Sequence, residues 1–129
     1  MWKDLGNYIL NLKDKRPLKV AEIGVGKFNE TYSYLKSFDD VEIIKVDIDP
    51  NDDEVIYDDI TKPNLDLYKD IDIIYSIRPP SELQPFLMDL KEKTDSILII
   101  RPLFNEDLNV GKSRMKLKNY GKASFYLSL

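Results

Sequence analysis

Apolar residues recur along the chain at two different spacings. Near the N-terminus four of them repeat at helical spacing: Trp2, Leu5, Ile9 and Leu12. This pattern predicts an amphipathic helix over residues 2–14. Similar patterns predict a short helix from Asn29, the expected N-cap, to about Phe38, and a longer helix over residues 81–93.

Short apolar runs bounded by turn residues predict the strands. They lie at residues 18–23, 41–48, 54–57, 71–76 and 96–100. The run at 71–76 is almost entirely apolar, which is typical of a strand covered on both faces. Two period-two segments at 114–119 and 123–129, joined around Tyr120 and Gly121, predict a closing antiparallel hairpin.

This order of elements predicts an α/β fold. We expect residues 1–129 to form one minimal Rossmann-like, three-layer domain with a mostly parallel sheet of about seven strands and an antiparallel C-terminal hairpin. Several covering helices should be reduced or missing. Six residues separate Asp47 from Glu54, too few for a crossover helix, and the eleven between Asp59 and Ile71 leave room for one helical turn.

Composition narrows the chemistry that the chain can perform. With 129 residues and 43% hydrophobic content, it can build a single core. No run of eighteen apolar residues and no basic, apolar leader is visible, so we expect a cytoplasmic protein without a membrane span. The absence of cysteine and histidine excludes disulfides, thiolate nucleophiles and the commonest metal ligand, and no metal site is expected.

Charge is separated along the chain, although the net charge is only −4. Residues 39–72 hold 13 acids and three lysines. Residues 110–129 hold five basic residues, including Arg114, Lys116 and Lys118, and no acid. A nucleic acid would be repelled by the first region, so such a partner is expected only locally, at the basic C-terminal hairpin.

A glycine turn after the first predicted strand carries the main candidate site. Gly24 and Gly26 lie between that strand and the short helix, and the next strand ends at Asp47. Such a unit places backbone N–H groups beside a carboxylate, the geometry that holds an adenosine-containing cofactor. A tight turn without a ligand is the alternative.

The spacing of the turn distinguishes two cofactors. The dinucleotide pattern requires a third glycine where Asn29 stands, whereas the S-adenosylmethionine (SAM) pattern has an acid two residues before the first glycine, where Glu22 stands. The third glycine of the SAM pattern is replaced by Phe28. The turn therefore favours SAM over a dinucleotide.

Three segments carry a resemblance to a known family: Glu22-Ile23-Gly24-Val25-Gly26-Lys27-Phe28, Tyr75-Ser76-Ile77-Arg78-Pro79-Pro80-Ser81-Glu82-Leu83-Gln84-Pro85 and Ile99-Ile100-Arg101-Pro102-Leu103. The chain resembles a small uncharacterised family of archaeal proteins related to the Rossmann-like (class I) SAM methyltransferases. The resemblance implies that Glu22 faces the aminocarboxylate end of SAM, Asp47 the ribose and Asp58 the adenine amino group.

A second candidate site consists of two Arg-Pro dipeptides. Arg78 follows the fourth predicted strand and Arg101 the fifth, so both should lie on one rim of the sheet. Two guanidinium groups there would bind a carboxylate or phosphate. The alternative is that each arginine pairs with a nearby acid.

Three functions remain open from the sequence. The chain is a SAM-binding protein of methyltransferase type, a non-catalytic binding or assembly module that kept the fold, or a small enzyme acting on an anionic metabolite held by Arg78 and Arg101. The first and third imply a small-molecule ligand.

We also predict that the chain self-associates as a homo-oligomer. A sheet that lacks covering helices leaves apolar surface, which proteins usually bury in an interface. Analytical ultracentrifugation at high micromolar concentration is expected to show a dimer or larger species. A monomer at that concentration would contradict the prediction.

Overall fold

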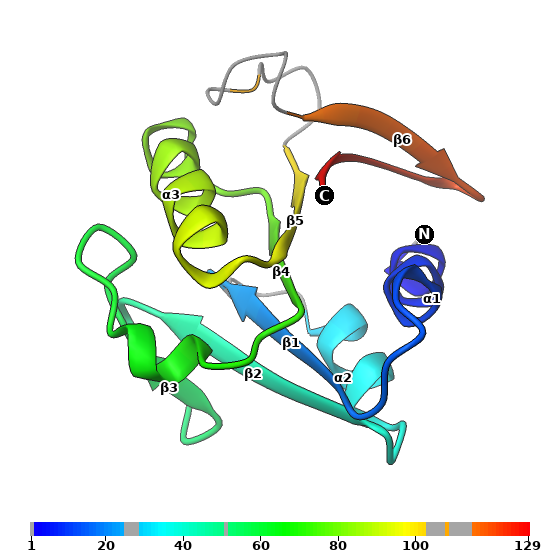
Figure 1. Ribbon diagram of the computed structural model, residues 1–129, viewed down its shortest axis with the longest axis horizontal. Coiled ribbons are helices and arrows are strands. Elements are labelled where there is room, and N and C mark those ends of the chain that lie inside the picture. The colour runs from blue at the N-terminus through cyan, green and yellow to red at the C-terminus, as the bar shows by residue number, and fades with distance from the viewer. Residues whose placement is uncertain (1, 25–28, 51, 103–107, 109–114) are drawn as a thin grey trace.

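The computed structural model describes residues 2–24, 29–50, 52–102, 108 and 115–129 (Figure 1). The helices are α1 (Trp2–Leu12), α2 (Glu30–Lys36) and α3 (Gln84–Thr94), with 3₁₀ turns η1 (Leu65–Tyr68) and η2 (Ser81–Leu83). The strands are β1 (Leu18–Ile23), β2 (Val41–Asp47), β3 (Val55–Tyr57), β4 (Ile73–Ile77), β5 (Ile97–Arg101), β6 (Lys116–Tyr120) and β7 (Ala123–Ser128).

The strands form a seven-stranded sheet in the order β3-β2-β1-β4-β5-β7-β6. Strands β1 to β5 are parallel to one another, while β7 runs antiparallel to both β5 and β6. The predicted α/β fold, with its mostly parallel sheet and antiparallel C-terminal hairpin, is therefore confirmed.

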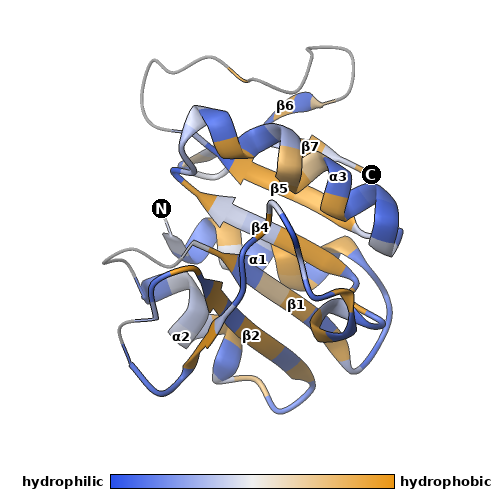
Figure 2. Cartoon of the chain, turned by 90° about the vertical axis from the view of Figure 1, so that its left-hand side faces the viewer, coloured by the Kyte–Doolittle hydropathy of each residue, from blue (hydrophilic) through white to orange (hydrophobic). Residues whose placement is uncertain are grey.

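Helices cover both faces of the sheet, which gives three layers (Figure 1). One core contains Leu5 and Ile9 of α1 and Leu35 of α2, packed against one face. The other core contains Leu87 of α3 and Tyr68 of η1, packed against the opposite face. Figure 2 shows apolar residues concentrated in β1, β4 and β5, between helices with hydrophilic outer surfaces.

The predicted shortage of crossover helices is also confirmed. The structure describes no helix between β2 and β3, and the connection from β3 to β4 contains only the 3₁₀ turn η1. The long predicted helix over 81–93 begins as η2 and continues as α3, with Pro85 in its first turn, where no intrahelical N–H donor is lost.

One capping prediction is wrong. Asn29 precedes α2, but its side chain makes no capping hydrogen bond. Instead its Oδ1 accepts a hydrogen bond of 3.2 Å from Nζ of Lys45 on β2. A buried ammonium group needs acceptors more than a surface helix end needs a cap, because water cannot replace them.

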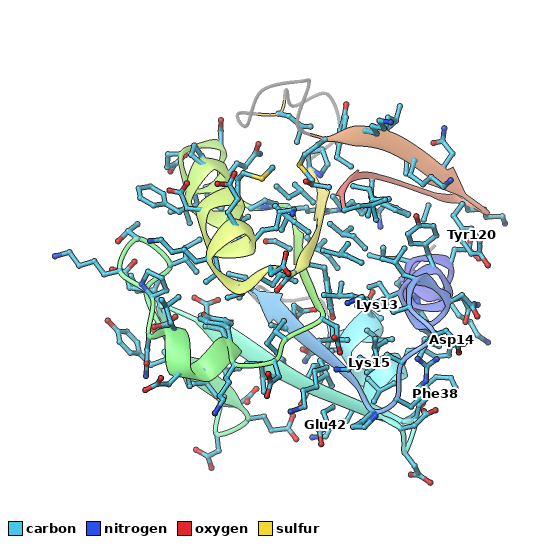
Figure 3. All side chains as sticks on the ribbon, viewed as in Figure 1. Lys13, Asp14, Lys15, Phe38, Glu42 and Tyr120 are labelled. Atoms are coloured by element: carbon cyan, nitrogen blue, oxygen red, sulfur yellow. The ribbon has the colours of Figure 1, made fainter. Side chains whose placement is uncertain are left out.

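Helix α1 contacts the turn of the C-terminal hairpin. The Lys122 backbone N–H donates to the Asp4 carboxylate at 2.8 Å, and the ring of Tyr120 lies edge-on to that of Tyr8, with centroids 5.3 Å apart (Figure 3). Gly121 has a φ of 58°, and a Cβ atom there would lie 2.7 Å from Cγ of Asp4. Any other residue at this position would have a strained backbone and would have to displace the Asp4 carboxylate.

Asp72, just before β4, joins three elements. Its buried carboxylate accepts hydrogen bonds from the Lys19 backbone N–H of β1 at 2.9 Å and from Nζ of Lys15 at 3.0 Å. Nζ of Lys13 lies 3.7 Å away, and both lysines belong to the segment around the end of α1 (Figure 3). Burial alone would raise the pKa of Asp72, but these donors lower it.

Asp72→Asn is expected to lower the free energy of unfolding at pH 7 by about 1–3 kcal/mol, because charge-assisted hydrogen bonds are lost from a buried site. The lowered pKa in the folded state means that the carboxylate stabilises the fold above its unfolded pKa and stops doing so as pH falls through the folded value. Urea unfolding at several pH values should show the variant approaching wild type in acid. The control Asp40→Asn removes an exposed pair with Arg16 and should cost only about 0–1 kcal/mol.

Candidate functional site

A cavity of about 420 Å³ opens at the carboxyl ends of β1, β2 and β4. The strand ends form its floor, and the segment from Arg78 through α3 forms one wall, with Leu83 and Leu87 facing the space. A smaller hollow of about 90 Å³ adjoins it near Asp58 and Ile60. The strand order reverses between β1 and β4, and ligands of open α/β sheets bind at this position.

Gly24 ends β1 at the mouth of the cavity. Its φ is 74°, a conformation that L side chains rarely adopt, and its N–H donates to the Val46 carbonyl at 2.8 Å. Among the described residues, the nearest atom to a Cβ built on Gly24 would be Oγ of Ser76, at 3.9 Å. The backbone is thus open to close approach by a ligand. Gly26, also predicted to bind the cofactor, lies outside the described residues.

Ser76 on β4 fixes the other side of this turn. Its buried hydroxyl donates a hydrogen bond of 2.7 Å to the Ile23 carbonyl, one residue before Gly24. Ser76 also lines the cavity. The turn is therefore held from β2 through Val46 and from β4 through Ser76.

The two predicted acidic residues of the adenosine site occupy different surroundings. Asp47, at the end of β2, lines both hollows and accepts a hydrogen bond of 3.0 Å from the Asp49 backbone N–H. Asp58 is buried, and its two oxygens accept from the Tyr68 hydroxyl at 2.6 Å and the Asn64 N–H at 3.0 Å. Asp58 therefore has a structural task in holding η1, besides facing the smaller hollow.

Glu22 is a buried acid in the middle of the sheet, only 2% exposed. The register places it beside Lys45 of β2 and Tyr75 of β4. Burial raises its pKa to about 7, while Tyr75 and Lys45 pull the pKa down and Glu30 pushes it up. The Tyr75 hydroxyl is near enough to influence this pKa, yet among the described residues neither Glu22 oxygen has a hydrogen-bond partner of good geometry.

Lys45 completes a buried polar cluster under α2. Besides Asn29, its Nζ lies 3.7 Å from Oε2 of Glu54 and 4.1 Å from the centroid of the Tyr32 ring. A cation over an aromatic face is stabilised when water is excluded. The sequence analysis missed Lys45 and Tyr75, and the only signal was a lysine flanked directly by apolar residues, Ile44 and Val46.

Arg78 and Arg101 lie at the ends of adjacent strands. Ile77 pairs with Arg101 in the β4–β5 register, and the Arg78 backbone N–H donates to the Arg101 carbonyl at 2.6 Å. Arg78 also lines the main cavity. The structure thus brings both arginines to the rim that carries Gly24 and Asp47. Whether they bind an anion stays a prediction.

Three structural features bear on membranes, metal ions and nucleic acids. Of the helices in the described part of the chain, none has the length and apolar character needed to cross a bilayer. The same residues contain no group of three or more acidic side chains arranged to hold a metal ion. The basic stretch of the hairpin forms part of β6, whose five residues are all exposed, and Arg114 lies outside the described residues.

The whole described chain matches one protein family. Residues 2–129 match the uncharacterised protein family UPF0146. The chain belongs to this family. A UPF0146 protein of Methanothermobacter thermautotrophicus is 38% identical over 98% of this chain and 93% of its own length. The UPF0146 protein MJ0688 of Methanocaldococcus jannaschii is 44% identical over 84% of this chain and 82% of its own. These archaeal relatives confirm the family resemblance seen in the sequence.

A solved structure shows the same fold with little sequence similarity. An S-adenosyl-L-methionine methyl transferase from Silicibacter pomeroyi superimposes with a TM-score of 0.61 at 14% identity, covering 98% of this UPF0146 chain and 89% of the enzyme. At such low identity the likeness concerns the fold. The fold of this UPF0146 protein is therefore methyltransferase-like.

Glu22→Gln is expected to stabilise the protein at pH 8 and to have little effect near pH 4.5. The acid has an ordinary pKa of 4.5 when unfolded and about 7 when folded, so the folded state holds its proton more tightly. Wild-type stability is therefore lost as pH rises through this interval, by up to about 3 kcal/mol. Denaturant unfolding across this pH range checks the prediction.

The exposed Glu42 offers a matched control. Between pH 5 and 8, the Glu42→Gln variant should keep the pH dependence of stability that Glu22 causes in the wild type. If Glu22→Gln were less stable than wild type at pH 8, the carboxylate would instead be ionised and stabilised by Lys45, and the raised pKa would be wrong.

Proposed function

We propose that this UPF0146 protein binds SAM, or its product S-adenosylhomocysteine, in the cavity at Gly24 and acts as a methyltransferase-type protein. The observation that carries the proposal is the open backbone of Gly24, with a φ of 74°, between the carboxylates of Glu22 and Asp47. The methyltransferase-like fold supports it.

The residues present fit such a ligand. A cavity of about 420 Å³ lies within the range of about 300–1,000 Å³ common for small-molecule sites. Its walls are mainly apolar, with Ile48, Ile60 and Leu83 available to cover a flat adenine ring. The Glu22 oxygens lack hydrogen-bond partners among the described residues, so they can still accept from an ammonium group.

Each residue would have a distinct task. Asp47 would accept hydrogen bonds from ribose hydroxyls, because it projects from the end of β2 beside Gly24. Glu22 would face the ammonium of the amino-acid end, and a cation there would favour its ionised form. When bound, SAM supplies a methyl group on a positively charged sulfur. The protein then mainly holds the second reactant in line and excludes water.

A non-catalytic binding module is the second candidate. The missing helix between β2 and β3 favours it, because that connection is too short to supply a further wall on the Asp47 side. Under this candidate the cavity binds an adenosine ligand without methyl transfer. Binding and turnover measured on the same preparation distinguish the two.

Isothermal titration calorimetry is expected to show S-adenosylhomocysteine binding to wild type. At a hundredfold excess over the dissociation constant, a ligand specific for the folded state adds about 2.7 kcal/mol of stability, measurable as a rise in melting temperature. Asp47→Ala should weaken binding about tenfold or more, because hydrogen bonds to a charged group are lost. Gly24→Leu should abolish binding.

Asp49→Ala provides the control, since Asp49 is exposed and is not among the residues that line the cavity. It should bind like wild type. Circular dichroism must show that Gly24→Leu still folds. No heat of binding with SAM or S-adenosylhomocysteine at millimolar concentration would refute the proposed function.

A further inference from the structure

The charge of the side chains at the carboxyl-end rim of the sheet changes from negative to positive along the rim. Asp58 and Asp47 follow β3 and β2 on one side of Gly24, whereas Arg78 and Arg101 belong to the ends of β4 and β5 on the other side. The proposed adenosine site uses the acidic half and the central turn. It leaves the two guanidinium groups of the cationic half without an assigned task.

The two arginines are held close together despite their like charges. A backbone hydrogen bond of 2.6 Å ties Arg78 to Arg101, and both follow directly from paired strands. Burial, and then the charge of Arg78, lower the pKa of Arg101. Arg78 is exposed and Arg101 is half-buried. An anion bound by both would lower the repulsion between their like charges.

The backbone of Arg78 provides an independent observation. Three non-glycine residues in the described chain have positive φ: Asp70, Arg78 and Asp95. Aspartate tolerates this left-handed conformation through its short polar side chain, but arginine has no such advantage. Glycine at position 78, with a φ of 57°, would be less strained. Strain of this kind is characteristic of positions where the side chain itself has a function.

We propose that Arg78 and Arg101 bind the carboxylate or phosphate of a second small molecule, which enters the cavity beside the adenosine ligand. This inference rests on the proposed function and assigns a chemical class to the second substrate. A guanidinium group donates two parallel hydrogen bonds to a carboxylate or phosphate. Ile77, Leu83 and Leu87 line the adjacent wall, so a mainly apolar body would accompany the anionic group.

Calorimetry with three matched probes tests the chemistry of the ligand. Benzoate carries a carboxylate on an apolar ring, phenyl phosphate carries a phosphate, and benzamide is the uncharged counterpart of benzoate. Wild type is expected to bind at least one of the two anions at least about tenfold more tightly than benzamide. The anion that binds more tightly shows whether the site prefers a carboxylate or a phosphate. Equal binding of benzamide and both anions would overturn the proposal.

Variants test the residues. Arg78→Gly and Arg101→Gln should each weaken the preferred anion about tenfold or more. Arg78→Gly should also melt at a temperature equal to or above that of wild type, because it relieves the strained backbone. Asp95→Gly is the matched control. Asp95 caps the end of α3 in the same left-handed conformation, so this change gives the same backbone relief and should leave anion binding unchanged.

A further arm separates this inference from the proposed function. The preferred anion should still bind when S-adenosylhomocysteine is saturating. S-adenosylhomocysteine has an amino-acid end that 5′-methylthioadenosine lacks. If the first compound blocks anion binding and the second does not, the arginines bind the carboxylate of the cofactor. The second-molecule proposal would then be wrong. If neither adenosine compound binds but the anion still depends on both arginines, the anion site stands and the proposed function fails. Unchanged anion binding in both arginine variants would overturn the inference.

Discussion

The parallel pairing of β1 with both β2 and β4 is the constraint on which the candidate site depends. Parallel strands end on the same edge of a sheet, so residues that are remote in sequence meet there. Gly24, Asp47 and Arg78 line one cavity because they lie at the ends of three adjacent strands. The order of the strands, rather than any local sequence, decides that these three residues share one space.

Much of this arrangement follows from the sequence. Apolar runs such as that of β4 mark buried strands, and the number of residues between strands limits the crossover helices. The environment of each site residue does not follow in the same way. Lys45 and Tyr75 flank Glu22 only through the register of three strands, which no local pattern encodes. Asn29 matched the preferences of a helix cap, but Lys45, brought near by folding, is its partner instead. Asp58 likewise acquired a structural partner, Tyr68, from the connection that follows β3.

The two faces of the central strand differ in what they contribute. On the side of α3, β1 presents Ala21 and Ile23 to an apolar core that stabilises the sheet. On the side of α2, Leu18 and Val20 of the same strand belong to the second apolar core, and Glu22 lies beside the buried Lys45 and Tyr75. Burying polar groups with incomplete hydrogen bonding costs stability, and it also makes their ionisation sensitive to a ligand. Both faces of β1 therefore support the fold, and Glu22 adds a buried charge beside the cavity.

The contact between α1 and the hairpin turn has a consequence for cooperativity. The hydrogen bond from Lys122 to Asp4 joins residues 118 positions apart, and closing so long a loop has an entropic cost that only the packed native state offsets. Helix α1 also covers the core that contains Tyr75, next to Glu22 on the neighbouring strand. Opening of the hairpin would break the contacts of Asp4 and Tyr8 with the turn and so loosen a helix that covers this core. The first helix and the last hairpin of the chain are therefore expected to open together, as one cooperative unit.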